Sequence, residues 1–142
     1  MIVAKDFKWE AAHRLPWHKG KCKHLHGHSY RMTVELEGEP NSQGLVIDFN
    51  DIKSMIEPHI QELDHTTIIS ANDAELKQVF DEKNWKYYLL AQDSTAENLC
   101  AHFMRAILER DSAILKANSI HAIGIKIAET ATAYAYLRQE IK

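Results

Sequence analysis

Alternating apolar and polar positions mark two strands near the start of the chain. In residues 7–13 (FKWEAAH) apolar side chains fall at every second position, and His13 ends the series. Residues 26–36 show the same alternation, and here His26 and His28 open the apolar series. A period of two residues is typical of half-buried β-strands. The pattern therefore predicts two strands whose apolar faces carry histidines at the ends nearest the connecting loop.

Two segments further along have a helical period instead. Apolar residues recur three and four positions apart over residues 52–63, and Pro58 inside this segment predicts a kink or a break. The second segment begins at STAE, where Ser94 and Glu97 have the spacing of a capping box. Its apolar stripe continues to Leu108 and includes Cys100, which we expect in the core.

The remaining segments are shorter or less regular. Residues 45–49 (LVIDF) follow turn residues and are expected to form a short extension of the sheet. Residues 70–92 are polar, and we expect an irregular excursion there with a short helix near residues 73–82.

Alternation returns at the end of the chain, in residues 123–127 and 133–141. The expected order is ββααββ: a four-stranded antiparallel sheet with two helices on one face, in the α+β class. A length of 142 residues is typical of a single domain, here residues 1–142.

Composition and charge narrow the class of protein. The chain is 45% hydrophobic and 26% charged, and its net charge of −3 argues against a general nucleic-acid binder. No apolar run approaches the ~20 residues of a membrane helix, and residues 1–10 lack the apolar core of a signal peptide. Two cysteines make no disulfide framework. We therefore expect a cytoplasmic protein without membrane partners.

The stretch HLHGH, residues 24–28, holds the chemistry. Side chains two apart on a strand are ~6.6 Å apart on one face, so His26 and His28 can share an ion, whereas His24 would lie ~13 Å from His28. A third ligand must come from His13, His18 or His24. Antiparallel pairing of the two strands selects His13. Three imidazoles with an open position are typical of catalytic Zn²⁺.

Two alternatives accompany these assignments. A lone histidine at a strand end is usually a polar residue in contact with solvent, but two on one apolar face opposite a third favour a metal.

Cys22 would ordinarily be a small buried hydrophobe. It lies, however, in the cationic stretch HKGKCKH beside the expected metal, which favours the reactive thiolate and a catalytic role.

Five motifs occur in order along nearly the whole chain: EAAHRLP, CKHLHGH, LDH, STAENL and ETATAY. Together they resemble the 6-pyruvoyl-tetrahydropterin synthase superfamily, and within it most closely its bacterial 6-carboxytetrahydropterin synthases. The resemblance implies the tunnelling fold, in which four-stranded sheets of several subunits close into a barrel. It also implies a homohexamer, built as a dimer of trimers, with sites at subunit interfaces.

The resemblance assigns roles to individual residues. It implies one zinc ion per subunit on His13, His26 and His28, in agreement with the spacing. It also implies proton transfer by Cys22 and His65, with Asp64 as the carboxylate that orients the imidazole. On residue type alone, Asp64 and His65 would be polar residues at a helix end. The family usually continues this motif with Leu-Asn, whereas TTIIS follows here.

The resemblance further implies a site for a pterin ring. Glu129 would accept hydrogen bonds from the ring N–H and the exocyclic amine and would also be a catalytic residue, coupled to the proton relay. Thr95 and Thr130 would be further contacts. A lone carboxylate at a strand end is otherwise usually solvated. The basic residues of the loop fit either a triphosphate or plain solvation: Arg14, Lys19, Lys21 and Lys23. The family often has Gly where Tyr134 stands.

The activity implied is that of a zinc-dependent lyase in 7-deazaguanine (queuosine) biosynthesis. It would convert 7,8-dihydroneopterin triphosphate into 6-carboxy-5,6,7,8-tetrahydropterin, acetaldehyde and triphosphate. The alternatives are 6-pyruvoyl-tetrahydropterin synthesis without acetaldehyde release, a non-catalytic pterin or metal binder, and a zinc hydrolase. Three residues between Cys22 and His26 resemble the carboxy branch, and Lys23 argues against an aldolase-like variant that has Glu there.

Overall fold

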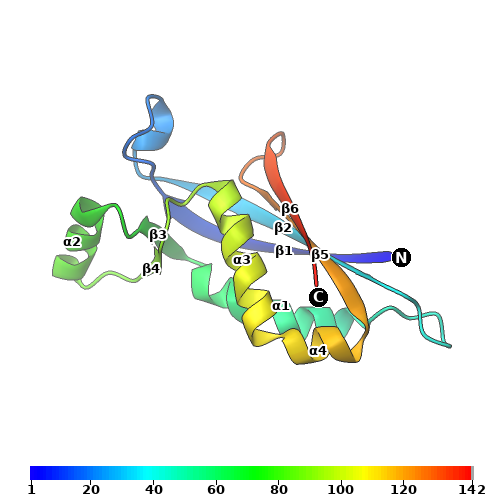
Figure 1. The fold of residues 1–142 in the computed structure, drawn as a ribbon. Helices are drawn as coiled ribbons and strands as arrows, with labels where there is room; N and C mark the ends of the chain where they lie inside the picture. Colours follow the sequence, from blue (N-terminus) through cyan, green and yellow to red (C-terminus); the bar gives the residue numbers. More distant parts are fainter. Residues whose placement is uncertain (142) are drawn as a thin grey trace.

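The computed structural model describes residues 1–141 (Figure 1). Within them, six strands are β1 (Ile2–His13), β2 (His26–Gly38), β3 (Thr66–Ser70), β4 (Tyr87–Leu90), β5 (Ile120–Ala128) and β6 (Tyr134–Glu140). The α-helices are α1 (Phe49–Leu63), α2 (Ala74–Lys83), α3 (Ala96–Arg110) and α4 (Ser112–Ala117). A short 3₁₀ turn, Lys21–Lys23, interrupts the loop between β1 and β2.

The strands form one mixed sheet in the order β4-β3-β1-β2-β5-β6. The four strands β1, β2, β5 and β6 pair antiparallel, as the alternation predicts. A sheet of only four strands was the wrong expectation, because β3 pairs parallel to β1 and β4 pairs parallel to β3. All five residues of β3 are buried, so this strand has no alternation that a sequence pattern could show.

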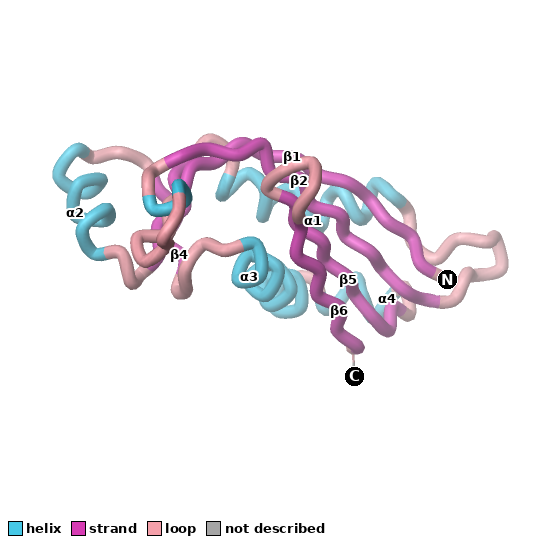
Figure 2. Tube along the Cα trace, turned by 90° about the horizontal axis from the view of Figure 1, so that it is seen from above, coloured by secondary structure: helices cyan, strands magenta, loops and turns pink. Residues whose placement is uncertain are grey.

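The core lies between one face of the sheet and the helices α1 and α3 (Figure 2). Trp9 of β1 stacks on Tyr30 of β2 with ring centroids 5.0 Å apart, and Phe103 of α3 packs against Trp9. The other face of β1 and β2 carries the alternate, mostly exposed side chains. The predicted arrangement of two helices on one face is therefore present, with α2 and the short α4 as additions.

Residues 45–49 form no strand, which corrects the expected sheet extension. Asp48 is the N-cap of α1, where its side chain accepts a hydrogen bond from the Asn50 backbone N–H. Phe49 already belongs to the helix. Val46 and Ile47 are buried in the core, so the apolar run in the sequence reflects a packed entry into α1.

Pro58 does not break α1, which is assigned as one helix from Phe49 to Leu63. The missing N–H of a proline leaves the carbonyl four residues earlier without its helical partner. Pro58 and Ser54 are both on the exposed face, where water can satisfy that carbonyl.

The expected irregular excursion at residues 70–92 is an ordered strand–helix–strand unit, β3–α2–β4. Its predicted short helix is confirmed as α2, which Asp73 caps by accepting from the Leu76 N–H. Asn84 ends this helix in the left-handed conformation. A small apolar cluster around Phe80 gives the unit a core of its own. No helix within residues 1–141 has the length and apolar character needed to cross a membrane.

Candidate metal centre and adjoining pockets

The paired ends of β1 and β2 bring three histidines together. His13 lies directly opposite His26 in the antiparallel ladder, and His28 lies two residues further along β2. One ligand nitrogen from each ring lies within 4.8 Å of the others. The Nε2 atoms of His26 and His28 are 3.1 Å apart. This is the cluster that the spacing in the sequence predicts.

Backbone carbonyl groups orient two of the rings. His13 Nδ1 lies 2.8 Å from the Ser94 carbonyl oxygen, and His26 Nδ1 lies 2.6 Å from that of His24. A carbonyl only accepts, so Nδ1 carries the hydrogen in both rings and Nε2 presents a lone pair. This outer hydrogen bond is the usual companion of a metal-bound imidazole.

Burial favours the neutral form of His13 and His28. His13 is 1% exposed, and its Nε2 has no hydrogen-bond partner among residues 1–141. Burial lowers the pKa of His13 to about 4, and it also lowers the pKa of His28. A buried nitrogen with a free lone pair is a hydrogen-bond acceptor without a donor, and a bound cation would satisfy it.

The three histidines could hold a metal ion. Nitrogens bound at about 2.0–2.1 Å in a tetrahedral site lie roughly 3.3 Å from one another. The 3.1 Å separation of two Nε2 atoms and the 4.8 Å limit for the whole cluster require only small adjustments. Three imidazoles leave one tetrahedral position open for a substrate oxygen or water.

Glu129, directly after β5, lies beside this cluster. Its carboxylate oxygens are 3.8 Å from His13 Nε2 and 3.9 Å from His28 Nε2. Burial raises its pKa above the ordinary value. Glu129 also lines a pocket of about 330 Å³, so it faces both the cluster and an open volume.

That pocket, called here the thiol pocket, joins several of the predicted site residues. Cys22 from the loop, Thr95 at the start of α3 and Glu129 all line it, together with Leu15 and His18. Cys22 is partly exposed, as a reactive thiol requires. Cys100 is buried in the core, and burial raises the pKa of its thiol to about 11.

The helix that begins at this pocket is capped by Thr95 and not by Ser94, which corrects the predicted capping box. The Thr95 side chain accepts from the Asn98 N–H, one position later than the expected pair. Ser94 is fully buried, and its carbonyl and hydroxyl oxygens both lie near His13 Nδ1. The sequence predicted Ser94 only as a helix cap and not as a residue that supports His13, although it precedes the predicted site residue Thr95.

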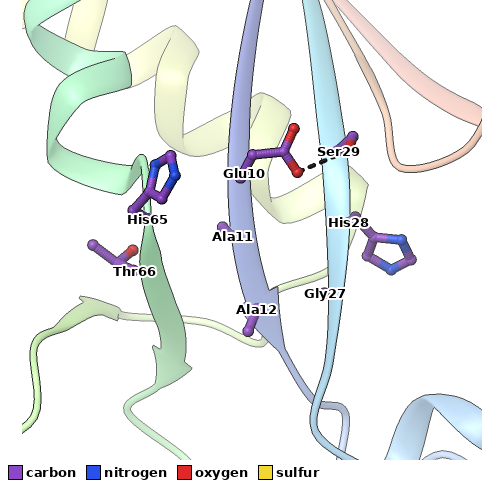
Figure 3. A pocket seen from close by; sticks show the side chains of 8 residues that line it. All are labelled: Glu10, Ala11, Ala12, Gly27, His28, Ser29, His65 and Thr66. Carbon is purple, nitrogen blue, oxygen red and sulfur yellow. Dashed lines mark hydrogen bonds between the residues drawn. The ribbon is translucent and has the colours of Figure 1, made fainter.

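Asp64 and His65 lie elsewhere. They line the turn from α1 into β3, and His65 opens onto a second pocket of about 330 Å³ with Glu10 and Ser29 (Figure 3). His28 also borders this pocket, but its ring points away from His65 (Figure 3). Cys22 is not among its lining residues. One chain therefore does not bring the predicted thiol and imidazole into one pocket.

The geometry of the pair nevertheless fits an oriented imidazole. His65 Nδ1 lies 3.0 Å from Asp64 Oδ2, and the ring is 77% exposed. Asp64 Oδ1 accepts from the Glu10 backbone N–H, which lowers the pKa of the carboxyl group, and the Glu10 carbonyl accepts from the His65 N–H. His65 has a left-handed φ of 57°, so the backbone leaves the helical path at this residue.

Two further predicted contacts are less well placed. Thr130 is exposed, its hydroxyl accepts from the Thr132 N–H, and it is not among the residues that line the thiol pocket. Arg14 forms ion pairs with Asp73 and Glu75, so its charge is already neutralised. Of the basic residues considered for a triphosphate, the three lysines of the loop remain exposed.

Comparison with known proteins supports this geometry. The family model described as 6-pyruvoyl tetrahydropterin synthase matches residues 2–140. The chain belongs to the 6-pyruvoyl tetrahydropterin synthase family. A family member from Haemophilus influenzae named 6-carboxy-5,6,7,8-tetrahydropterin synthase is 31% identical over 140 residues, which cover 93% of this chain and 94% of that protein. A Rickettsia bellii protein of the same name is 29% identical and covers 89% and 91%.

Solved structures of the family share the fold. A Plasmodium falciparum 6-pyruvoyl tetrahydropterin synthase superposes with a TM-score of 0.80 at 23% identity, covering 99% of this chain and 98% of that one. A protein from Wolinella succinogenes superposes with a TM-score of 0.74 at 20% identity, covering 96% and 97%. At these identities the superpositions establish the fold of the 6-pyruvoyl tetrahydropterin synthase family and not a particular reaction.

Proposed function

We propose that this chain is a zinc-dependent lyase of the 6-carboxytetrahydropterin synthase type. It would convert 7,8-dihydroneopterin triphosphate and one water molecule into 6-carboxy-5,6,7,8-tetrahydropterin, acetaldehyde and triphosphate, as a step of 7-deazaguanine (queuosine) biosynthesis. The observation that carries this proposal is the three-histidine cluster beside a pocket that holds a thiol and a carboxylate. The relatives named 6-carboxy-5,6,7,8-tetrahydropterin synthase support the choice of reaction.

In this proposal Glu129 fixes the pterin ring. A pterin presents a ring N–H and an exocyclic amine side by side, and one carboxylate can accept from both. Glu129 has the required position, since it borders both the thiol pocket and the histidine cluster. Thr95 lines the same pocket and contributes a second polar contact. Thr130 would be a more distant contact, on the turn that follows Glu129.

His13, His26 and His28 would hold the zinc ion. When bound, zinc supplies Lewis acidity toward the two hydroxyl groups of the substrate side chain. The residues around it then move the protons. Cys22, in the same pocket as Glu129, is the group proposed to take up a proton from the side chain. The pterin ring receives the reducing equivalents internally, so no nicotinamide or flavin is needed.

His65 would complete the site from a second copy of the chain. Within one chain, His65 and Cys22 line different pockets, while a proton transfer needs both groups near one substrate. His65 is 77% exposed and held by Asp64, so it is available to a neighbouring subunit. This separation supports a site shared between subunits. The proposed assembly, a homohexamer built as a dimer of trimers, would provide such interfaces.

The test is product analysis. Zinc-loaded protein is incubated with 7,8-dihydroneopterin triphosphate, and acetaldehyde, triphosphate and pterin products are measured. We expect acetaldehyde and 6-carboxytetrahydropterin in equal amounts. Cys22→Ala should lose turnover but keep its zinc, while Cys100→Ala, a matched change in the core, should keep both. Unchanged turnover in Cys22→Ala would remove the thiol from the mechanism.

A second candidate is 6-pyruvoyl-tetrahydropterin synthesis, in which triphosphate leaves and no acetaldehyde forms. The family model that matches residues 2–140 is described as 6-pyruvoyl tetrahydropterin synthase, and this description supports the second candidate. A pyruvoyl product without acetaldehyde would establish this candidate. Absence of any product, with pterin binding retained, would indicate a non-catalytic member of the fold.

A further inference from the structure

The loop of residues 14–25 joins two of the candidate zinc ligands. It leaves β1 directly after His13 and enters β2 at His26, and it carries Cys22. Much of this loop is exposed, and it has no regular structure apart from the 3₁₀ turn at Lys21–Lys23. A thiol that acts on a bound substrate needs a fixed position, so contacts that hold this loop bear on function.

The first anchor is an ion pair between Arg14 and Asp73. Arg14 Nε lies 2.7 Å from Asp73 Oδ2, and Arg14 Nη2 lies 2.8 Å from Asp73 Oδ1. The Asp73 side chain is only 5% exposed, and the residue also caps α2. A two-point contact of this kind fixes direction as well as distance, which a lysine could not reproduce.

The second anchor joins Trp17 to Asp93. Trp17 Nε1 donates to Asp93 Oδ2 at 2.8 Å, while the ring itself is 60% exposed. Asp93 is held in turn, because its other carboxylate oxygen accepts from the Ser70 hydroxyl at 2.9 Å. Asp93 immediately precedes Ser94, whose carbonyl orients His13. The anchor thus lies one residue from the support of a candidate zinc ligand.

Hydrogen bonds within the loop connect the two anchored residues, Arg14 and Trp17, to Cys22. The backbone N–H of Leu15, next to Arg14, donates to the Cys22 carbonyl at 2.8 Å. The Leu15 carbonyl accepts from the His18 N–H, next to Trp17, at 2.9 Å. Leu15 is buried and lines the thiol pocket. Both anchors therefore flank the residue that holds the Cys22 backbone.

We propose that Asp73 and Asp93 are positioning residues that hold the Cys22 loop against the thiol pocket through Arg14 and Trp17. This inference rests on the proposed function for its effect on turnover. It gives the β3–α2–β4 unit a role, since Asp73 caps its helix and Ser70 of β3 supports Asp93. The β3–α2–β4 unit would serve as a rigid support for the loop that carries Cys22.

The test removes each anchor from the loop side by a conservative change. Arg14→Lys keeps the charge but not the two-point contact, and Trp17→Phe keeps the aromatic ring but not the N–H. We measure the alkylation rate of Cys22 by iodoacetamide in the zinc-loaded protein, together with kcat, KM and bound zinc. Cys100 contributes little to alkylation because it is buried.

The expected result separates positioning from folding. Each variant should bind zinc at one ion per chain and keep its KM, while kcat falls by about tenfold or more because the thiol is misplaced. Cys22 should be alkylated roughly three- to tenfold faster because the loop opens. Asp73→Asn and Asp93→Asn should reproduce these effects from the other side of each anchor.

Matched controls are Arg110→Lys and Trp85→Phe. Arg110 also forms an ion pair, with Glu62, and Trp85 is a similarly exposed tryptophan next to Phe80. Neither residue contacts the loop, so alkylation and kcat should stay at wild-type values. A control that shifts both as strongly as the anchor variants do would overturn the proposal.

Two results separate this inference from the proposed function. If the wild-type protein forms no pterin product, the proposed function fails, and the alkylation rates still decide whether the anchors hold the loop. If turnover occurs but the alkylation rate of Cys22 is unchanged in both anchor variants, the inference is overturned. Faster alkylation with unchanged kcat would also overturn it, since the loop would then move without consequence.

Discussion

Within residues 1–141, two groups of polar side chains each contain a buried histidine, and they differ in how the ring nitrogens are used. The first is the cluster of His13, His26 and His28 at the ends of β1 and β2. The second, called here the helix-end network, consists of His59, Glu62, Arg110 and Asp111 at the ends of α1 and α3. His13 is 1% exposed and His59 is 3% exposed, so burial does not distinguish the regions.

Hydrogen bonding does distinguish them. In the helix-end network, His59 Nε2 lies 3.2 Å from Asp111 Oδ2 and His59 Nδ1 lies 3.4 Å from Arg110 Nη1, so both nitrogens have protein partners. In the histidine cluster, His13 Nε2 has none within residues 1–141. A buried histidine whose two nitrogens have protein partners is satisfied within the fold, whereas a buried nitrogen without a partner, beside two other imidazoles, is available to a ligand. This difference supports a structural role for the helix-end network and ligand binding by the histidine cluster.

The largest effect should come from removing a member of the cluster. His13→Ala deletes one of three nitrogen donors, and we expect zinc affinity to fall at least about a hundredfold. Turnover should fall with the loss of zinc. Metal content by mass spectrometry and competition with a chelator would measure the affinity. His24→Ala is the matched control, because its exposed ring takes no part while its carbonyl remains. Stoichiometric zinc in His13→Ala would contradict the assignment.

The next effect concerns pH and the metal-free protein. The unfolded chain protonates His13 near pH 6.5, whereas burial lowers the folded pKa to about 4. Between these values the unfolded state binds more protons, so stability decreases as pH falls from about 6.5 to about 4, by roughly 3 kcal/mol at most. Urea unfolding at several pH values would measure it. His13→Leu should flatten this part of the profile, and an equally steep profile in that variant would assign the effect to other groups.

A smaller effect is expected in the helix-end network. His59→Phe leaves Asp111 and Arg110 without their partner, so we expect a loss of about 2 kcal/mol in unfolding free energy. Zinc content should remain at the wild-type level. Chemical unfolding with zinc in excess tests both, and His121→Phe on the exposed side of β5 is the control. Loss of zinc in His59→Phe would mean that the two regions are not separate.

The smallest change should come from Ser94→Ala. The Ser94 carbonyl, 2.8 Å from His13 Nδ1, survives this substitution, and only the hydroxyl at 3.2 Å is lost. We therefore expect zinc affinity to fall by less than tenfold, at about the low end for outer-sphere partners of a metal site. Titration with a zinc indicator would measure it against Ser112→Ala. A larger loss would show that the hydroxyl, and not the carbonyl, orients the ring.

Some of this architecture was predictable from the sequence because the signal is local. The alternation in β1 and β2 predicts two half-buried strands, and antiparallel pairing places His13 opposite His26. The helical stripes predict α1 and α3 for the same reason. In each case one face is buried and the other exposed, so the periodicity of the chain records the burial directly.

Other features depend on contacts between distant segments. β3 is buried on both faces, so Thr66–Ser70 shows no alternation, and the strand–helix–strand unit was expected to be irregular. Val46 and Ile47 are buried in the core without strand pairing. Ser94 matters because of His13, which lies 81 positions away in the sequence. The separation of His65 from Cys22 likewise results from the path of α1 and not from any motif.

The junction between β1 and β3 has a consequence for how this protein can vary. β1 and β2 pair along their whole length, whereas β3 meets β1 through Ala11 and Ala12 alone. The register of the long pair is therefore independent of the length of the segment after His65. Insertions or deletions between α2 and β4 would therefore leave the histidine-bearing ends of β1 and β2 in alignment, and Ser70, Asp73 and Asp93 would keep the contacts that hold the Cys22 loop.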